Sequence, residues 1–487
     1  MSGTEVQQDS DGASPSAEKL PVYVDLDGTL SPSDLLWESI LTLLGSNFFA
    51  IFKLVGWLRE GKAKFKQRIA DAVDLDIPTI PINQAFLAYL NDLKSQGHRI
   101  VLATASNQKY AEQLAAELGV FDGVIASDAS VNCSGERKLA RIKADAKGDF
   151  IYAGNDHVDV VVWQDAAAAI VVDASPAVVK AAENCTVVEK HFPLKKPGIK
   201  VWAKALRLHQ WAKNALIFVP LVLAHKIDDP GLILQALVAF LAYGLTASSV
   251  YLLNDLLDLA NDRHHKTKCK RPFAAGTLPI AKGAWAIPAL LVAAGLLALT
   301  LPIKFIGVLL FYYVVTVAYS FWLKRHALVD VFLLAGLYTL RLIAGSAAVQ
   351  VELSFWLLSF SMFLFLSLAM VKRYTEVLDA GDSAKTGIKG RGYYYDDLPT
   401  IGQLGSASGY LAVLVMALYI NSAEVTVLYS EPRVLWLICP IIMFVVSRFW
   451  LLARRGELHE DPVVFAIKDR ISAVCAAMCA ILVWLGT

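Results

Sequence analysis

Cysteine and unbalanced charge are what this sequence has little of. Its 487 residues include six cysteines, and none of them stands in a CxxC pair or at the Cys/His spacing of a zinc site. A disulfide scaffold is therefore excluded, and we expect free thiols in a reducing compartment. Lysine and arginine nearly balance aspartate and glutamate, leaving a formal net charge of +1. That balance argues against nucleic acid as a partner.

Charged residues are also scarce, at 18% of the chain, whereas hydrophobic residues make up 56%. The excess is uneven, because residues 1 to about 200 have the composition of a soluble domain and the rest is mostly long apolar runs. The first 19 residues are polar and show no apolar run with a small-residue cleavage site. We therefore expect a disordered tail there and a first domain that stays in the cytoplasm.

The long apolar runs predict an all-α membrane domain over residues 211–487. A basic segment with proline and glycine, residues 196–210, precedes it as a linker or interfacial segment, and we place the domain boundary near Pro197. Roughly twenty apolar residues cross a bilayer. We therefore expect about nine transmembrane helices, at 215–225, 231–253, 283–301, 303–323, 328–349, 353–371, 406–421, 434–453 and 468–486.

Lysine and arginine are distributed unequally between the loops of this domain. The loops after the second, fourth, sixth and eighth predicted helices carry most of them. Positively charged loops stay on the cytoplasmic side. We therefore predict a multi-pass protein of the inner (cytoplasmic) membrane, with these loops and the N-terminal domain in the cytoplasm.

The stretch NDLLDLANDRHHKTKCKRPFAAG, residues 254–276, concentrates charge at the end of an apolar run. In a continuous helix, Asn254, Asp258 and Asp262 would share one face, with Asp255 one turn before Asp258. No cation stands among these acids, so they should repel each other unless Mg²⁺ binds. The cations that follow can hold phosphate oxygens; they are Arg263, Lys266, Lys268, Lys270 and Arg271. The pattern predicts a clamped diphosphate substrate, and the alternative is a charged loop that stops membrane transfer.

These residues resemble the first motif, NDxxDxxxD, of the UbiA superfamily of intramembrane prenyltransferases. Asn254, Asp255, Asp258 and Asp262 match it in full. The continuation resembles the pattern DRxHxxKxxRPxAAG of the decaprenylphosphoryl-5-phosphoribose synthases, and it matches at Asp262, Arg263, His265, Lys268, Arg271, Pro272 and Gly276. The resemblance implies Mg²⁺ on the aspartates and substrate phosphates on the cations.

Further segments resemble the same branch of the superfamily. They supply Lys213 and Asn214 in RLHQWAKN, Tyr319 and Lys324 in YSFWLK, and Lys372, Arg373, Tyr374 and Glu376 in KRYTE. The second acid pair of typical prenyltransferases, DxxxD, is not evident near KRYTE, which argues for a small polar donor; a solvated connector is the alternative for this loop. Arg341 lies inside an apolar run, where a charge needs a partner, and is a candidate as well.

The N-terminal domain, residues 20–195, has polar residues where apolar strands end. The strands end in Asp25 and Asp27, in Thr104, and in Asn155, Asp156 and Asp159, and GERKLARI supplies Lys138. The carboxyl ends of strands are where α/β sheets bind ligands. In this order the segments resemble the four motifs of the haloacid dehalogenase (HAD) superfamily, which implies a Rossmann-like α/β fold.

The HAD resemblance implies an Mg²⁺-dependent phosphatase. Asp25 would form an aspartyl-phosphate, and Asp27 would protonate the leaving oxygen and then activate water. Thr104 and Lys138 would hold the phosphoryl group. The metal ligands would be Asp25, Asp27 and one or more of Asn155, Asp156 and Asp159. Many members have Asp where this chain has Asn155, so the last ligand stays open, and a degenerate domain that only binds or stabilises is the alternative.

Residues 34–82, between the first two HAD motifs, have a helical pattern and stand where a helical cap covers the HAD site. Their apolar side chains include Trp37, Phe49, Phe52 and Trp57, and a basic tail runs from Arg59 to Arg68. These side chains form the core of the cap or lie on a membrane surface. The two interpretations are compatible.

Both resemblances together imply one function. The membrane domain would transfer 5-phosphoribose from phosphoribosyl diphosphate to a polyprenyl (decaprenyl-like) phosphate at the cytoplasmic membrane face, and the HAD domain would dephosphorylate the lipid-linked product. One alternative is a prenyl transfer from prenyl diphosphate to an aromatic acceptor. Another is a transporter or scaffold with a vestigial HAD module. A homo-oligomer is compatible with all of them.

Overall fold

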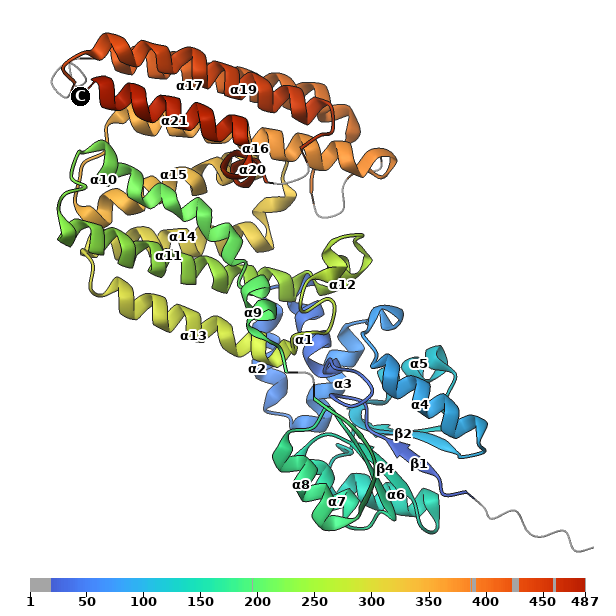
Figure 1. Cartoon of the computed structure of the whole chain (residues 1–487). Helices are drawn as coiled ribbons and strands as arrows, with labels where there is room; N and C mark the ends of the chain where they lie inside the picture. The colour runs from blue at the N-terminus through green and yellow to red at the C-terminus, as the bar shows by residue number, and fades with distance from the viewer. Residues whose placement is uncertain are drawn as a thin grey trace, which may run out of the picture. The chain divides into compact units, whose positions relative to one another are not determined.

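The computed structural model describes residues 19–194, 196–385, 387, 391–422, 429–458 and 461–486. The chain divides into two compact units (Figure 1): an N-terminal unit, Met1–Val201 with Asp255–Ala281, and a helical unit, Trp202–Asn254 with Lys282–Thr487. The predicted tail lies outside the described residues apart from Lys19. The predicted borders assumed consecutive segments, whereas the N-terminal unit also includes the Asp-rich stretch after Asn254.

A parallel sheet forms the centre of the N-terminal unit. Its strands are β1 (Val22–Val24), β2 (Ile100–Asn107), β3 (Gly123–Ser127), β4 (Ile151–Gly154), β5 (Ala168–Val172) and β6 (Val187–Phe192). They lie in the order β3-β2-β1-β4-β5-β6, and all neighbours are parallel. The predicted α/β fold is confirmed. Because the order reverses between β1 and β4, the carboxyl end of β1 lies at the crevice where such sheets bind ligands.

Apolar cores lie on both faces of this sheet, since successive strand residues point in opposite directions. Val22 and Val24 join one core and Tyr23 joins the other. The helices that complete these cores are α4 (Gln84–Ser95), α5 (Gln108–Leu118), α6 (Glu136–Ala146), α7 (Val160–Trp163) and α8 (Pro176–Cys185), and the short 3₁₀ turns are η1 (Ile77–Thr79) and η2 (His157–Asp159). The result is a doubly wound α/β layer.

Three of the helices between β1 and β2 lie within residues 34–82, where the sequence predicts a helical cap. They are α1 (Leu35–Ser46), α2 (Ala50–Leu58) and α3 (Lys62–Ala72). A small core of Leu43, Ala50, Leu54, Ile69 and Val73 joins them. The helical pattern is thereby confirmed, and the capping of the HAD site stays a prediction.

The Asp-rich stretch of the N-terminal unit is not one continuous helix. α11 (Pro230–Leu257) ends before Asp258, and α12 (Leu259–His264) begins after it. The Asp262 N–H still donates to the Asp258 carbonyl across this break. The predicted single helical face of Asn254, Asp258 and Asp262 is therefore wrong in detail. A 3₁₀ turn, η4 (Lys268–Lys270), follows.

The helical unit is built from long apolar helices. They are α13 (Ile280–Ala298), α14 (Ile303–Phe321), α15 (Val329–Val349), α16 (Phe355–Ala380), α17 (Leu398–Ile420), α19 (Ile438–Arg454), α20 (Pro462–Lys468) and α21 (Arg470–Gly486), with most of α11. Shorter pieces are α9 (Ile199–Ala205), η3 (Leu208–Phe218), α10 (Val219–Leu223), η5 (Leu323–Arg325), η6 (Gly381–Ala384), η7 (Tyr395–Asp397) and η8 (Pro432–Leu437).

Seven helices in the described part of the chain are long and apolar enough to cross a membrane, or eight if the bent pair α20 and α21 counts as one span. The predicted number of nine is not confirmed. The difference arises at 215–225, where the chain forms a 3₁₀ segment and the five-residue α10 instead of a long helix. The multi-pass character of the protein is unaffected.

Helix α15 is the centre of the helical unit. It contributes Val331, Ala335 and Leu342 to one apolar cluster and Leu337 and Ala344 to another. Gly345 on the same helix lies where a Cβ atom would come within 2.1 Å of the Ile217 carbonyl oxygen. Glycine therefore permits the close approach of η3 to α15, and this contact holds Lys213 and Asn214 beside α15.

Candidate active sites

Asp25 and Lys138 form a buried ion pair at the carboxyl end of β1. The Lys138 Nζ atom, on α6, lies 2.8 Å from Asp25 Oδ1 and donates to the Tyr152 hydroxyl at the same distance. Both charged side chains are nearly inaccessible to solvent. The sequence predicted that these two residues act together, and the fold brings them into contact over 113 positions of the chain.

Asp27 is held by two donors. Its Oδ1 accepts a hydrogen bond from the Leu35 N–H at 3.0 Å, and its Oδ2 accepts one from the Ser106 hydroxyl at 2.6 Å. Leu35 begins α1, and Ser106 follows Thr104 on β2. Thr104 itself is fully buried, and its hydroxyl accepts from the Ser106 N–H. Thr104 therefore shapes the end of β2 that presents Ser106 to Asp27.

Burial changes the protonation of both HAD carboxyls. Burial raises the pKa of Asp25 to about 6, although Lys138 opposes the shift. Burial, together with the charge of Asp34, raises the pKa of Asp27 to about 7, although the Ser106 hydrogen bond opposes this. A carboxyl with such a pKa can give and take a proton near neutral pH, which is the behaviour needed for the acid/base role predicted for Asp27.

The three residues after β4 have different environments. Asp159 is buried; it accepts from the Tyr152 hydroxyl and from the backbone N–H groups of Asn155 and Asp156. Asp156 is exposed and caps η2. The Asn155 amide lies so close to Gly28 that a Cβ atom there would be 2.2 Å from its Nδ2. Asn155 therefore lies beside Gly28 in the turn after Asp27, and Asp159 Oδ1 lies 3.7 Å from the Nζ atom of Lys138, the partner of Asp25.

In the Asp-rich stretch, one arginine bridges two aspartates. Arg271 NH1 lies 3.0 Å from Asp255 Oδ1 and 2.6 Å from Asp262 Oδ2. Both carboxylates are buried, and burial raises the pKa of Asp262 even beside Arg271. No cation stands among these acids in the sequence, but in the structure the loop folds back and Arg271 lies between Asp255 and Asp262. The prediction of unneutralised acids is therefore wrong.

The other candidates of this stretch differ in accessibility. Asp258 is half-buried, and His265 and Lys268 are exposed. Arg263, predicted to hold phosphate, instead forms a buried two-pronged ion pair with Glu38 on α1, with NH2 2.6 Å from Oε1 and NH1 3.2 Å from Oε2. A guanidinium engaged in this way is not available for a substrate phosphate.

The donor chemistry of both stretches suits Mg²⁺. Asp255, Asp258 and Asp262 offer carboxylate oxygens, and Asp25 with Asn155 offers carboxylate and amide oxygens, which are the ligands Mg²⁺ prefers. Among the described residues, however, no group of three or more His, Cys, Asp or Glu side chains is already gathered as a metal site. The donors fit the ion by type, without a preformed cage.

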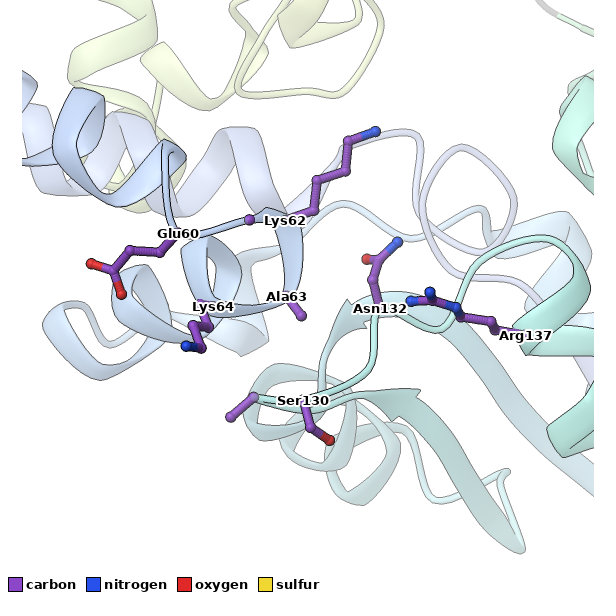
Figure 2. A pocket seen from close by; sticks show the side chains of 9 residues that line it. Glu60, Lys62, Ala63, Lys64, Ser130, Asn132 and Arg137 are labelled. Atoms are coloured by element: carbon purple, nitrogen blue, oxygen red, sulfur yellow. The ribbon is translucent and has the colours of Figure 1, made fainter.

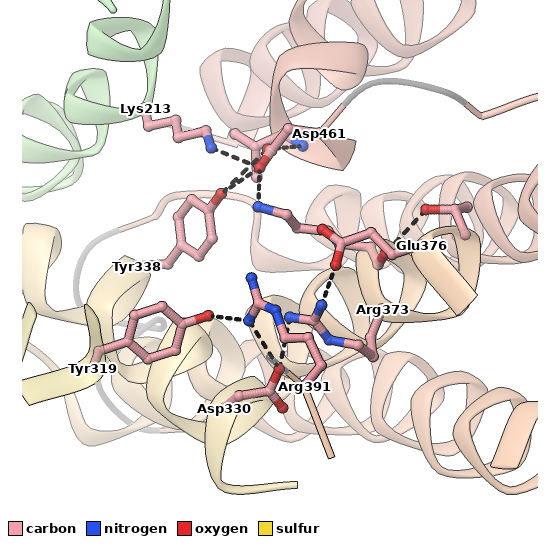
Figure 3. A network of polar contacts seen from close by, with 11 residues as sticks. Lys213, Tyr319, Asp330, Tyr338, Arg373, Glu376, Arg391 and Asp461 are labelled. Atoms are coloured by element: carbon pink, nitrogen blue, oxygen red, sulfur yellow. Dashed lines mark hydrogen bonds and ion pairs between the residues drawn. The ribbon is translucent and has the colours of Figure 1, made fainter. Parts of the chain in front are cut away.

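In the helical unit, Asp461 gathers the predicted lysines (Figure 3). Lys213 Nζ lies 2.7 Å and Lys372 Nζ 3.2 Å from Asp461 Oδ2, and the Tyr338 hydroxyl donates to Oδ1 at 3.2 Å. Burial alone would raise the pKa of Asp461, but Lys372 and Lys213 outweigh it and hold this pKa well below its usual range. Three segments far apart in sequence thus meet at one carboxylate.

A second carboxylate, Asp330 at the start of α15, gathers the arginines (Figure 3). Arg373 NH2 lies 2.6 Å from Asp330 Oδ2, and neither side chain is accessible to solvent. Arg391 NH1 lies 3.5 Å from the same oxygen and donates to the Tyr319 hydroxyl at 2.8 Å. Arg373 also pairs with Glu376. The predicted Arg373, Glu376 and Tyr319 therefore belong to one network.

Arg341 has the partners that its place in an apolar helix requires. Its Nε donates to Asn214 Oδ1 at 3.0 Å, and NH1 donates to the Leu337 carbonyl at 2.6 Å. The guanidinium also lies over the rings of Tyr243, Tyr312 and Tyr338, at 5.2, 5.7 and 5.4 Å from their centroids. The expectation of a partner is confirmed, with aromatic faces as well as an amide.

The remaining candidates take peripheral or packing positions. Lys324 Nζ donates to Asn254 Oδ1 at 3.4 Å. Tyr374 packs its ring edge-to-face on Trp450 at 5.9 Å and belongs with the apolar core. Nothing in this contact points to a substrate, so a packing role explains Tyr374.

Sequence reasoning missed several residues of these sites. A buried acid within an apolar segment signals function, and that rule alone identifies Asp330. Ser106 and Tyr152 carry no comparable signal, because hydroxyls are common on buried strands. The central position of Asp461 depends on the packing of segments that are far apart in the sequence.

Comparison with known proteins gives two family matches. The model of the UbiA prenyltransferase family matches residues 215–485, and that of the haloacid dehalogenase-like hydrolases matches residues 22–161. The two matches together account for both predicted parts of the chain, and the N-terminal region is HAD-like.

Three relatives are similar to long parts of the chain. The uncharacterized protein y4nM of Sinorhizobium fredii is 37% identical over 95% of this chain and 90% of its own length. The nodulation protein NoeC of Azorhizobium caulinodans is 31% identical over 56% of this chain and 89% of its own. The decaprenyl-phosphate phosphoribosyltransferase of Mycolicibacterium smegmatis is 30% identical over 58% of this chain and 90% of its own.

Proposed function

The chain belongs to the UbiA prenyltransferase family, and we propose that its membrane part transfers 5-phosphoribose from phosphoribosyl diphosphate to a polyprenyl phosphate. Both substrates are anions, and the relative from Mycolicibacterium smegmatis is named a decaprenyl-phosphate phosphoribosyltransferase. The missing second acid pair near Lys372 also fits a donor other than a prenyl diphosphate.

The observation that supports this proposal is the excess of cations over carboxylates around Asp330 and Asp461, in the described part of the helical unit. Among the described residues, five cations and three carboxylates lie there; Lys213, Arg341 and Arg373 are buried, Lys372 and Arg391 are partly exposed, and the carboxylates are Asp330, Glu376 and Asp461. Asn214 adds a buried Nδ2 donor without a hydrogen-bond partner among the described residues. Unbalanced cations and an unused buried donor are costly unless an anionic ligand binds.

Each group then has a defined task. The lipid phosphate oxygen attacks C1 of the ribose while the diphosphate leaves from the opposite side, so no protein nucleophile is needed. Lys213, Lys372 and Asn214 bind phosphate oxygens, and Arg341 orients Asn214 through Oδ1. Asp255, Asp258 and Asp262 would hold Mg²⁺, which when bound neutralises the leaving diphosphate. Arg271, which lies between Asp255 and Asp262, would supply a further positive charge for the diphosphate.

The test is an incubation of membranes containing the protein with labelled phosphoribosyl diphosphate, Mg²⁺ and polyprenyl phosphate. We expect label in the lipid extract, and none with Asp258→Ala. Asp396→Ala, which removes an exposed acid at η7, is the matched control and should keep full activity. If the lipid stays unlabelled while a labelled prenyl diphosphate is consumed, the proposal fails in favour of an aromatic prenyl transfer.

For the N-terminal unit, we propose hydrolysis of the 5-phosphate from the lipid-linked product. The supporting geometry is that of Asp25, Asp27, Lys138 and Asn155 around the end of β1. Asp25 attacks phosphorus and forms an aspartyl-phosphate while the ester oxygen leaves with the proton of Asp27; Asp27 then takes a proton from the water that hydrolyses the aspartyl-phosphate. Lys138 neutralises the phosphoryl oxygens, and Mg²⁺ held by Asp25 and Asn155 would share that charge.

This second activity is tested with the full-length protein and its own lipid product. We expect release of phosphate from the lipid-linked phosphoribose, and accumulation of the phosphorylated lipid with Asp25→Asn. Hydrolysis of soluble sugar phosphates without any hydrolysis of the lipid would contradict the assignment.

The membrane orientation belongs to the same proposal. Because the spans alternate in direction, the loops after α11, α14, α16 and α19 share one membrane face, and these are the lysine- and arginine-rich loops. The positive-inside rule places this face in the cytoplasm of the inner membrane. Fusion of a cytoplasm-active reporter after Gly381 should give signal, and a signal only from a reporter active outside would reverse the orientation.

A further inference from the structure

Helix α2 carries an apolar surface that its own unit does not cover. Phe49, Ile51, Phe52, Val55 and Leu58 are 40% to 72% exposed. The other exposed large apolar side chains in the described residues of the N-terminal unit, Val158, Val187, Leu194 and Ile199, are spread along the sequence. A contiguous apolar patch on a folded surface marks an interaction site.

Basic residues flank this patch. They are exposed on α2, in the turn that follows and at the start of α3, at Lys53, Arg59, Lys62 and Lys64. The acid among them, Glu60, is paired with Arg68 at 3.2 Å. Exposed aromatic and aliphatic side chains bordered by lysine and arginine characterise helices that lie in the interface of an anionic bilayer.

A cationic pocket opens at the carboxyl end of α2 (Figure 2). Its volume is about 350 Å³, and its charged lining residues are three cations, Lys62, Lys64 and Arg137, and one acid, Glu60; Asn132 also lines it. Asn132 accepts a hydrogen bond from Lys66, whose Nζ also donates to the Ala105 carbonyl next to Thr104. The pocket therefore suits a phosphate group and adjoins the end of β2, where the HAD residues lie.

Covalent connections tether the N-terminal unit, which contains α2, to candidate membrane spans. The Asp-rich stretch of the N-terminal unit continues directly into α11 and α13, which are two candidate membrane spans. The buried pair of Glu38 and Arg263 ties this stretch to α1, and α1 shares an apolar core with α2. A partner protein is not needed to explain the patch, because the chain itself supplies an apolar phase.

We propose that α2 lies in the membrane interface, with its apolar side chains among the lipid chains and the adjoining cationic pocket on anionic lipid head groups. The N-terminal unit is then attached to the membrane in two ways, by its covalent link to the membrane spans and by α2 in the interface. A site held in this way receives phosphate esters that are themselves anchored in the bilayer, without extraction of the lipid.

The test is photo-crosslinking of the full-length protein in vesicles of phosphatidylcholine and phosphatidylglycerol that carry a radiolabelled lipid. Benzoylphenylalanine replaces Phe52 or, separately, Val55, and adducts with lipid are counted after irradiation. Position Leu310, 62% exposed on the candidate span α14, is the positive control, and the exposed Glu117 on α5 is the negative one. We expect lipid adducts at Phe52 and Val55 close to the yield at Leu310 and none at Glu117.

Lipid charge tests the pocket. The double variant K62E/K64E should lower the adduct yield at Phe52 at least about twofold in vesicles with phosphatidylglycerol and leave it unchanged in phosphatidylcholine alone. The proposal is overturned if Leu310 gives lipid adducts while Phe52 and Val55 give none, or give only protein adducts. The role of the pocket is overturned if the double variant changes the adduct yield at Phe52 equally in vesicles with and without phosphatidylglycerol. None of these readouts depends on the reaction that the HAD residues perform.

Discussion

Glu38 and Arg263 form a buried ion pair that joins helix α1 to the Asp-rich stretch, 225 positions further along the chain. The two side chains are 3% and 6% exposed, and both guanidinium nitrogens reach the carboxylate. Ser33 also donates to the same carboxylate. Four residues before Glu38 the chain caps α1, and the Leu35 N–H binds Asp27. The first turn of α1 thus connects Asp27, through the Leu35 N–H, with Arg263, through Glu38.

Breaking this pair should destabilise the N-terminal unit. Glu38→Gln leaves Arg263 buried without a counter-charge, which costs about 3–5 kcal/mol, so we expect a clearly lower thermal unfolding midpoint of the purified protein. Glu60→Gln removes the acid of an exposed pair with Arg68 and should cost less than about 1 kcal/mol. Equal effects of the two variants would mean that the Glu38 pair is not buried in solution.

The pH profile of the phosphatase should respond to Ser106. Asp27 must hold a proton to act as the acid, so activity should fall as pH rises through its pKa of about 7. The Ser106 hydroxyl stabilises the ionised form of Asp27, and its removal raises the pKa. Ser106→Ala should therefore move the alkaline limb of the profile to higher pH. A limb that stays in place or moves to lower pH contradicts this role of Ser106.

Gly28 should tolerate no side chain. Its φ is +82°, and a Cβ atom would meet the Asn155 amide at 2.2 Å, so Gly28→Ala should displace Asn155 and remove most phosphatase activity. Gly119→Ala is the matched control, since Gly119 also has a positive φ, +63°, but faces open space. The control should lose about 1 kcal/mol of stability and keep its activity. Comparable activity losses in both variants would exclude a specific role for Asn155.

The Asn214 Nδ2 donor, which has no hydrogen-bond partner among the described residues, should bind substrate. Asn214→Asp keeps an oxygen for Arg341 but loses the Nδ2 donor, so the KM for phosphoribosyl diphosphate should rise about tenfold, as for a lost hydrogen bond to a charged group. Asn421→Asp changes an exposed amide at the end of α17 and should leave KM unchanged. A fall in stability with an unchanged KM would make Asn214 a structural residue.

Local patterns were sufficient to predict the two-part organisation. Apolar strands ending in acids predicted the α/β fold, and Asp25 meets Lys138 because helix α6, which carries Lys138, packs against β2 and β3. The number of spans was less accessible, since the run at 215–225 has the composition of a membrane helix but forms a 3₁₀ segment and a short helix, next to Gly345. Apolar composition shows that a segment can lie in a bilayer, but it does not show whether the segment forms a helix long enough to span it.

The sequence by itself determined which residues are chemically competent: the aspartates after β1, the Asp-rich stretch, and the lysines and arginines of the basic loops. Only the tertiary structure decided how they pair. Arg271 lies between Asp255 and Asp262, Arg263 is taken by Glu38, and Asp461 gathers Lys213 and Lys372. The physical reason is that a buried charge needs a partner within a few ångströms. Which partner is near depends on how distant segments pack together, and the spacing of residues within a motif does not determine that packing.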